Sequence, residues 1–238
     1  MSRAIDVCVS PELLNLYDLR GKLVVVVDIF RATSCMVTAL SEGVERIHPV
    51  ATLDECQDLA KTGYLTAAER GGEQVEGFDL GNSPRAYLNK AYADKKVAVT
   101  TTNGTLAITK SAPYAEQVLI GAFLNISALA EYLKAQEEDV LILCAGWKGK
   151  VNMEDTLFAG ALVDRLADTH ALACDAPLAS QTLYKCVKED LHAYLMRSSH
   201  AQRLSKFGVE EDIKFCLKED LYTTIPILKG DELVSLEV

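Results

Sequence analysis

Two continuous apolar runs constrain the fold more than any other feature of this sequence. LVVVV at 23–27 and VLILC at 140–144 have no alternating polar positions, so strands formed by them would be buried on both faces. Strands of this kind lie inside a sheet that is covered by helices on both sides. Short strand-like runs also alternate with segments of helical period along most of the chain. We therefore expect an α/β fold, a three-layer α/β/α sandwich with a mostly parallel or mixed central sheet.

The expected elements follow this alternation. Strands are predicted at 5–9, 22–28, 45–50, 64–68, 97–101, 117–121, 139–144 and 170–174. Helices are predicted near 32–42, 53–62, 83–90, 104–111, 126–136, 153–167, 180–197 and 209–218. The tail TTIPILKGDELVSLEV predicts an antiparallel C-terminal β-hairpin around Gly230 and Asp231, which we expect to close the edge of the sheet. Because no repeat and no linker-like stretch is found, residues 1–238 are expected to form one domain.

Composition and charge exclude several classes of function. The 24 Lys and Arg residues against 34 Asp and Glu residues give a formal charge of −10, which repels a polyanion, so no nucleic acid is expected as a partner. No apolar run approaches the roughly 20 residues needed to cross a bilayer, and Asp6 interrupts the region where a signal peptide needs an apolar core. We expect a cytoplasmic protein with no membrane partner. Cytoplasmic enzymes of this size are often symmetric dimers, so a homodimer is one expected oligomeric state.

The cysteines and histidines show no metal-binding spacing. The seven cysteines are scattered without a C-x-x-C pair, and we expect reduced, mostly buried thiols. Cys144, at the end of a predicted strand, is expected to be a structural thiol, with a nucleophile as the alternative. The histidines are expected to be structural or surface residues: His48, His170, His192 and His200.

The first motif that carries chemistry is VVVVDIFRATS at 24–34. Asp28 follows a buried strand, in the position where loops of open α/β sheets bind ligands. In one interpretation Arg31 pairs with Asp28 while Thr33 or Ser34 caps the next helix. In the other, Asp28 is a Mg²⁺ ligand or a nucleophile, and Arg31 binds an anionic group of the substrate.

The second motif is the polar stretch ERGGEQVEGFDLGNSPRAY at 69–87. It contains Glu69, Arg70, Asn82 and Ser83, and its Gly71-Gly72 pair allows backbone to approach a ligand closely. Because Ser83 precedes a proline, we expect a helix N-terminus there, whose free N–H groups would favour an anion. A plain surface loop is the alternative.

The third and fourth motifs repeat the order of strand, polar loop and helix. VAVTTTNGTLAI places Thr102 and Asn103 before a helix, with small residues that leave room for a phosphate, although a capping turn without a ligand would look the same. VLILCAGWKGKVNMEDTLFAGALV places Lys148 in a glycine-rich loop and the acids Glu154 and Asp155 in the first turn of a helix. First-turn acids often only complement the helix dipole, and the alternative is a site for a metal ion and an anion.

Taken together, the four motifs resemble the 2-phosphosulfolactate phosphatase (ComB-like) family over nearly the whole chain. The resemblance implies a three-layer fold and Mg²⁺-dependent hydrolysis of 2-phospho-3-sulfolactate, a small anionic phosphoester, to sulfolactate and phosphate, a step toward coenzyme M. It implies catalytic roles for five residues: Asp28, Arg31, Glu69, Glu154 and Asp155. Three of them are the implied metal ligands: Asp28, Glu154 and Asp155. Six others would surround the substrate: Arg70, Asn82, Ser83, Thr102, Asn103 and Lys148.

Two other functions remain open at the level of the sequence. The substrate could be another small phosphorylated hydroxy acid, or the chain could be a non-catalytic anion-binding protein on the same fold. The first alternative predicts release of phosphate from other esters. The second predicts ligand binding without turnover.

Overall fold

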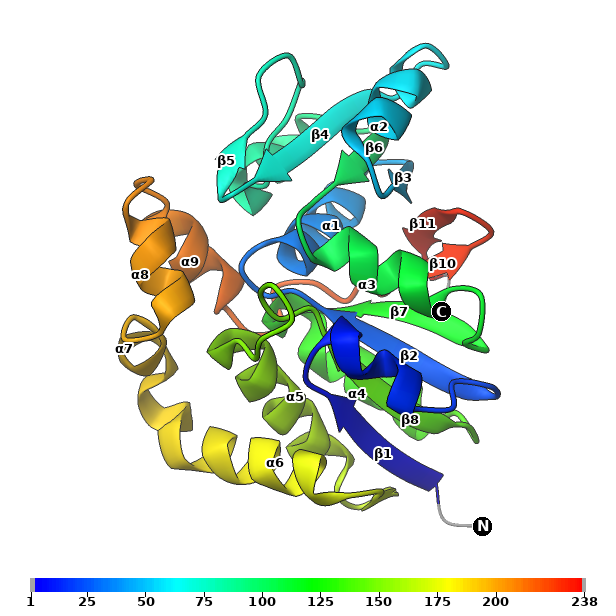
Figure 1. Cartoon of the computed structure of the whole chain (residues 1–238), viewed down its shortest axis with the longest axis vertical. Helices are drawn as coiled ribbons and strands as arrows, with labels where there is room; N and C mark the ends of the chain where they lie inside the picture. The colour runs from blue at the N-terminus through cyan, green and yellow to red at the C-terminus, as the bar shows by residue number, and fades with distance from the viewer. Residues whose placement is uncertain (1–2, 237–238) are drawn as a thin grey trace.

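The computed structural model describes residues 3–236 and contains an extensive sheet of mixed direction (Figure 1). Its strands are β1 (Arg3–Cys8), β2 (Lys22–Val27), β3 (Arg46–Pro49), β4 (Leu65–Arg70), β5 (Glu73–Gln74), β6 (Lys96–Thr100), β7 (Gln117–Gly121), β8 (Asp139–Cys144), β9 (His170–Leu172), β10 (Pro226–Lys229) and β11 (Glu232–Ser235). Their order in the sheet is β5-β4-β6-β3-β11-β10-β7-β2-β8-β1-β9. The predicted α/β class is confirmed.

Parallel pairing dominates on both sides of the sheet. β7, β2, β8, β1 and β9 form one parallel group, and β4, β6 and β3 form a second. The two continuous apolar runs form β2 and β8, which pair with each other inside the first group. All residues from Leu23 to Val27 are buried, as expected for a strand covered on both faces.

The predicted C-terminal hairpin is present, but its predicted place at the edge of the sheet is wrong. β10 and β11 pair around Gly230, which has a φ of +61°. β10 also pairs with β7, and β11 pairs with β3, so the hairpin joins the two parallel groups in the interior of the sheet. The reason lies in the side chains: Ile227 and Leu233 are buried, and an edge strand would leave more of them in water.

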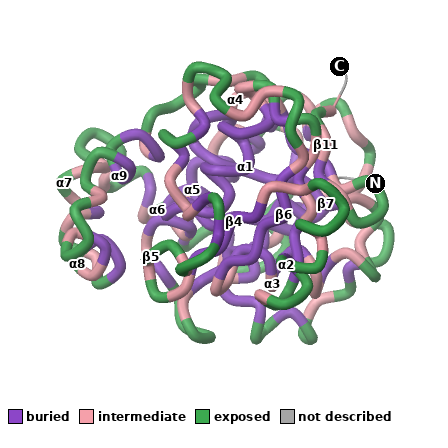
Figure 2. Tube along the Cα trace, turned by 90° about the horizontal axis from the view of Figure 1, so that it is seen from above, coloured by how far each residue is buried: buried purple, intermediate pink, exposed green. Residues whose placement is uncertain are grey.

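Helices flank the sheet on both faces. The α-helices are α1 (Ala32–Ser41), α2 (Leu53–Ala60), α3 (Gly104–Ser111), α4 (Ile126–Lys134), α5 (Met153–Leu166), α6 (Asp175–Val187), α7 (Leu191–Leu195), α8 (Ser199–Ser205) and α9 (Glu210–Cys216). On one face Ala68 belongs to a small apolar cluster with Cys56 of α2. Its neighbour Ala67 faces the other way and belongs to the main core with Met36 of α1, because successive strand residues alternate between faces. Figure 2 shows buried residues concentrated in the interior around α1, β4 and β6.

Within residues 3–236 there are also four 3₁₀ segments: η1 (Pro11–Leu16), η2 (Pro84–Lys90), η3 (Phe123–Asn125) and η4 (Lys188–Asp190). The helix predicted at 83–90 is η2, which is interrupted by non-helical backbone at Leu88 and Asn89. The helix predicted at 180–197 begins earlier, because the Cys174 thiol accepts from the Ala176 N–H at the N-cap. It ends at Val187, and Asp190 then caps a separate helix, α7.

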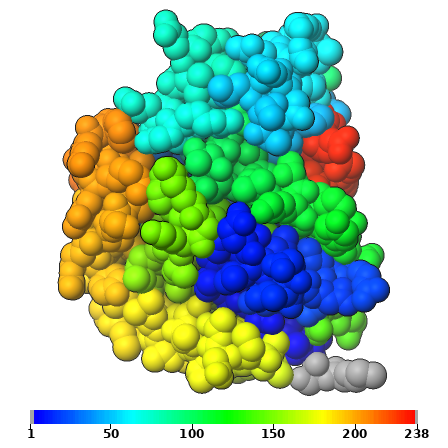
Figure 3. Space-filling view, viewed as in Figure 1, coloured from blue at the N-terminus to red at the C-terminus, as the bar shows by residue number. Residues whose placement is uncertain are grey.

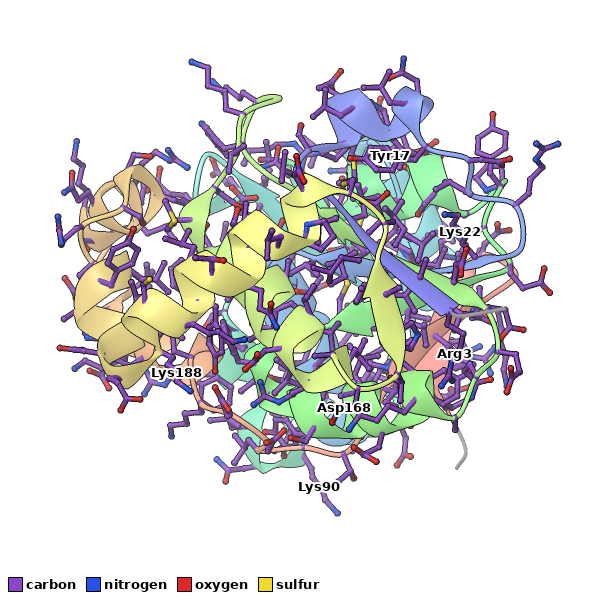
Figure 4. All side chains as sticks on the ribbon, turned by 90° about the horizontal axis from the view of Figure 1, so that it is seen from below. Arg3, Tyr17, Lys22, Lys90, Asp168 and Lys188 are labelled. Carbon is purple, nitrogen blue, oxygen red and sulfur yellow. The ribbon has the colours of Figure 1, made fainter. Side chains whose placement is uncertain are left out.

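The chain from 191 to 216, here called the α7–α9 arm, packs back toward the sheet. Lys188, labelled in Figure 4, marks the end of α6, after which the chain turns into this arm. The arm approaches the loop after β4 so closely that a side chain at Gly72 would lie 3.1 Å from the Phe207 ring. Helix α8 within it was not predicted from the sequence.

Two further predictions concern the cysteines and the membrane. The seven cysteines are free, and only Cys174 and Cys186 are exposed, so the thiols are mostly buried as expected. Within residues 3–236, every helix is too short or too polar to span a bilayer.

Candidate active site

A pocket lies at the carboxyl edge of the sheet, where loops after several strands meet the α7–α9 arm. The loops contribute Asp28 after β2, Glu69 at the end of β4, Asn82 before η2 and Asn103 before α3. In Figure 3 the orange surface of the arm lies beside the yellow-green loop after β8 and below the cyan segment that contains β4 and β5. The edge of the sheet is the one expected for ligand binding in open α/β folds.

Asp28 is held at the base of this pocket by its own turn. Its N–H donates to Thr33 Oγ1 at 3.0 Å, and its carbonyl accepts from the Thr33 N–H at 3.0 Å. Ser34 Oγ donates to the Ile29 carbonyl at 2.9 Å. The interpretation in which Thr33 or Ser34 caps α1 is wrong, because these hydroxyls bind the β2–α1 turn and Arg31 occupies the N-cap position.

Gly104 lets the start of α3 approach Asp28. A Cβ atom at position 104 would lie 2.9 Å from Asp28 Oδ2 and 2.7 Å from the Cβ of Ala32. Both contacts are closer than carbon atoms tolerate. The glycine of the TTTNGT motif therefore brings the loop with Asn103 against the loop with Asp28.

Asp155 connects two of the loops through its carboxylate. Oδ1 accepts from the Ile29 N–H at 2.8 Å, and Oδ2 accepts from the Gly146 N–H at 3.2 Å. The side chain is fully buried. Both oxygens are thus engaged by backbone, which fixes the β2–α1 turn relative to the loop after β8.

Glu154, the neighbouring acid on α5, has one engaged and one free oxygen. Oε1 is hydrogen-bonded to His200 Nδ1 of the arm. Oε2 is buried and has no hydrogen-bond partner among the described residues. The His200 ring stacks on Trp147 with 5.9 Å between centroids. Glu154 therefore holds the orientation of the arm's imidazole and retains one unoccupied acceptor.

Glu69 and Arg31 have their polar atoms engaged within the protein. Glu69 Oε1 accepts from the Gly72 N–H, and Oε2 accepts from Thr102 Oγ1 at 3.2 Å. Arg31 donates to Asp212 at 2.8 Å and to the Gly72 carbonyl at 2.8 Å. The interpretation in which Arg31 pairs with Asp28 is wrong, because the buried carboxylate of Asp212 on α9 takes that place.

Burial and mutual repulsion raise the pKa values of the central acids. The pKa of Asp28 is raised to about 7, first by burial and then by the negative charges of Glu69 and Glu154, although His200 acts in the opposite direction. The pKa of Asp155 is raised well above its usual range by burial and by the charges of Asp28 and Glu154. This edge of the sheet therefore gathers more carboxyl groups than its own cations can keep ionised.

Comparison with known proteins identifies the family. Residues 8–231 match the family model described as 2-phosphosulpholactate phosphatase. The chain belongs to this family. A Thermotoga maritima protein named probable 2-phosphosulfolactate phosphatase is 42% identical over 213 residues, which cover 90% of this chain and 92% of the relative. Proteins with the same name from Caldanaerobacter subterraneus and Picosynechococcus are 41% identical over 222 residues and 37% identical over 210 residues, covering 91% and 85% of this chain and 92% and 86% of the relatives.

Membership of the 2-phosphosulpholactate phosphatase family gives context to the predicted site residues that line the pocket. Five of them line the pocket: Asp28, Arg31, Glu69, Asn82 and Asn103. A sixth, Glu154, is hydrogen-bonded to His200, which also lines it. The family name describes hydrolysis of a phosphoric monoester, for which a pocket with carboxylates and cationic side chains is chemically suitable.

Other predicted substrate-binding residues of the family site lie behind the pocket or outside it. Arg70 donates to Thr100 Oγ1 at 2.9 Å, and Ser83 Oγ donates to Asp212 at 2.9 Å. Thr102 is bonded to Glu69. Lys148 is exposed, with Nζ 5.5 Å from the centre of the Trp147 ring. Thr102 thus supports a lining residue, whereas Lys148 lies outside the lining.

Sequence reasoning missed the contribution of the arm. His200, which was expected to be structural or surface, lines the pocket, as do Arg203 and Leu204. Asp212 pairs with an arginine 181 positions earlier in the chain. The arm has short helices and no glycine-rich motif, so only the charged and aromatic residues themselves hinted at a site.

The fit of a metal ion can be tested on the donors present. Across residues 3–236, no three His, Cys, Asp or Glu side chains are grouped so that they could hold a metal ion together. Asp155 has both oxygens bonded to backbone. Two carboxylates remain as oxygen ligands for a metal: Asp28, which also accepts from the Ala32 backbone N–H, and Glu154 through its unpartnered Oε2. Two carboxylates suit Mg²⁺, which usually keeps several waters and binds through one or two acids and the substrate.

Proposed function

We propose that this protein is a Mg²⁺-dependent phosphatase that hydrolyses 2-phospho-3-sulfolactate to 3-sulfolactate and inorganic phosphate. Family membership over residues 8–231 supports the class of reaction. The observation that carries the proposal is the pocket in which the buried acid Asp28 meets the wall formed by His200 and Arg203. That combination suits a reaction in which negative charge develops on phosphoryl oxygens.

In this proposal Asp28 and Glu154 would hold the Mg²⁺ ion, and Asp155 keeps Asp28 in place. The proposal thus narrows the predicted ligand set, because the oxygens of Asp155 bind the Ile29 and Gly146 amides. When bound, Mg²⁺ neutralises charge on the phosphoryl group and lowers the pKa of a coordinated water. A nucleophilic role for Asp28 is the alternative, and it predicts a phosphoenzyme that hydroxylamine traps.

The other lining residues would bind and orient the substrate. The amides of Asn82 and Asn103 can donate hydrogen bonds to anionic oxygens, and Gly71 gives backbone a close approach. Arg31 stays paired with Asp212 and holds the shape of the lining rather than offering a free charge. His200, with Nδ1 bonded to Glu154, presents its ring to the pocket in a fixed orientation and can donate to the oxygen of the leaving group.

The assay that tests the proposal is release of inorganic phosphate from 2-phospho-3-sulfolactate, with Mg²⁺ and then with excess chelator. Metal-dependent turnover that is selective for this substrate supports the proposal. A panel of other phosphorylated hydroxy acids tests the substrate separately. Turnover of another panel member would keep the chemistry and change the substrate, whereas binding without turnover across the panel would indicate a non-catalytic anion-binding protein.

Three broader points belong to the same proposal. The family resemblance implies a place on the route toward coenzyme M. A cytoplasmic location and a homodimer stay predictions. Size-exclusion chromatography with light scattering measures the oligomeric state directly.

A further inference from the structure

The pocket contains one guanidinium group, that of Arg203, with a nitrogen that has no hydrogen-bond partner among the described residues. Arg203 of α8 lines the pocket, and its Nη2 is buried without a hydrogen-bond partner among the described residues. A buried donor without a partner is costly, so such atoms are rare in folded proteins. The other arginine of the lining, Arg31, is already bonded to Asp212 and to the Gly72 carbonyl.

The aromatic neighbours of Arg203 hold its side chain in one place. Its Cζ lies 3.9 Å from the centre of the Trp147 ring, the distance of a close cation–π contact. Trp147 also stacks on His200, which Glu154 holds through Nδ1. Arg203 thus contacts Trp147, which contacts His200, and these contacts restrict the guanidinium before any ligand binds.

The electrostatics of Arg203 favour an anionic ligand. Burial lowers the pKa of Arg203, because a desolvated guanidinium without a partner is costly, while the charges of Glu154 and Glu69 act in the opposite direction. None of the ion pairs within residues 3–236 involves Arg203. A guanidinium is weakly hydrated and offers a planar fork that matches carboxylate and sulfonate oxygens.

We infer that Arg203 binds the anionic group of the substrate that lies away from the phosphate, the sulfonate or the carboxylate, and thereby determines substrate specificity. This inference rests on the proposed function, because it assumes a phosphoester with a second acidic group. Arg203 takes the role that the sequence assigned to Lys148, which is exposed and outside the lining.

The test compares three substrates with wild type and the Arg203→Gln variant. They are 2-phospho-3-sulfolactate, 2-phospholactate without the sulfonate, and 2-(phosphooxy)ethanesulfonate without the carboxylate. We expect kcat/KM of the variant on the complete substrate to fall about 10- to 100-fold, the range for one charge-assisted contact. For the truncated substrate that lacks the group bound by Arg203, kcat/KM of the variant should differ from that of wild type by no more than about threefold. An equal loss on all three substrates, or no loss, would overturn the inference.

Two variants control for charge and folding. Arg197→Gln removes the same charge from an exposed position on the arm, where Arg197 lies 5.7 Å from the Tyr194 ring and outside the pocket lining. It should leave all three kcat/KM values unchanged. Arg203→Lys retains the charge and loses the planar fork, so we expect an intermediate loss. Thermal melting checks that each variant is folded.

Calorimetric titration with 3-sulfolactate separates this inference from the proposed function. If wild type releases no phosphate, the proposed phosphatase activity fails, and the titration still decides the role of Arg203. Binding that is at least about tenfold weaker in Arg203→Gln than in Arg197→Gln supports the anion site. Equal binding by the two variants, or no binding by wild type, would reject it.

Discussion

The two walls of the pocket differ in how many of their polar atoms the protein already uses. On the wall formed by β4 and the β2–α1 turn, Glu69 has both oxygens bonded and Arg31 is paired with Asp212. On the wall formed by Trp147 and the arm, Arg203 Nη2 has no partner among the described residues. Neither has Oε2 of Glu154, which supports this wall through its bond to His200. We therefore infer that the first wall mainly supports the fold and that the second wall binds the ligand.

This difference shows why charged residue type alone does not identify a ligand-binding group. Arg31 and Arg203 carry the same guanidinium and line the same pocket. A side chain whose hydrogen bonds are satisfied must break them to bind a substrate, whereas an unpartnered one gains a contact. Substitutions on the two walls should therefore have different dominant effects, and four of them test this.

The largest expected effect is a loss of stability on the scaffold wall. Asp212→Ala would leave Arg31 buried and unpaired and remove the acceptor of Ser83, so the free energy of unfolding should fall by about 3 to 5 kcal/mol. Urea denaturation measures it. The matched control is Glu211→Ala on the same helix, whose pair with Lys214 is exposed and screened by water, so its loss should change the free energy of unfolding far less. Equal losses in the two variants would contradict a scaffold role for the pair.

Glu154 supports the binding wall through His200, and Glu154→Gln should affect activity more than stability. The amide keeps a partner for His200 but removes the charge from the free oxygen, so we expect kcat/KM to fall about 100- to 1,000-fold. Mg²⁺ should raise the Tm of wild type and not of the variant. Glu69→Gln makes the same change on the other wall and should mainly lower Tm. A greater loss of activity in Glu69→Gln would reverse the comparison.

Asp28 lies between the walls, and its substitution should separate stability from activity. Its pKa is about 7 in the folded protein and near 3.8 when exposed, so unfolding releases its proton at intermediate pH. In chelator, this group lowers wild-type stability as pH rises from about 4 to 7, by roughly 2 to 4 kcal/mol in total, and the penalty persists above pH 7. In Asp28→Asn this decrease of stability with rising pH should be absent. The variant should also have no phosphatase activity.

Urea denaturation of both proteins in chelator at pH 4, 6 and 8 measures this effect. The variant should gain stability relative to wild type as pH rises, and Mg²⁺ at pH 8 should narrow the gap by stabilising wild type alone. A constant difference across pH would show that folding does not raise the pKa of Asp28 and would contradict the prediction.

The smallest expected effect is at Lys148. Because its side chain is exposed and outside the lining, Lys148→Gln should change kcat/KM by less than about threefold. Phosphate-release kinetics under the conditions used for Arg203→Gln provide the comparison. A loss as large as that of Arg203→Gln would restore Lys148 to the binding wall.

The sequence predicted the sheet well for a physical reason. β2 and β8 are continuous runs of apolar residues, and only a strand buried on both faces suits such a run. Strand ends then placed Asp28 and the other loop residues at one edge. The position of the C-terminal hairpin was not predictable in this way, because its apolar residues show that it is buried but not which strands it pairs with.

The partners of the site residues could not be predicted from local sequence. The Glu154 contact spans 46 positions and the Arg31 contact spans 181. Periodicity and capping rules describe neighbours within a few residues, whereas these contacts depend on how the arm packs against the loops. The sequence therefore identified the charged residues of the motifs. It could not predict which of them are hydrogen-bonded within the protein and which have free atoms.

The interior position of the hairpin has a consequence for the order in which the protein can assemble. Residues 226–235 are the only link by strand pairing, within residues 3–236, between the group ending in β3 and the group ending in β7. During synthesis, each of the two parallel strand groups therefore keeps an unpaired edge strand until residues 226–235 have left the ribosome. Unpaired edge strands can pair with other chains. A chain truncated before Pro226 would contain two partial sheets with unpaired edge strands. We therefore expect this fragment to aggregate during expression.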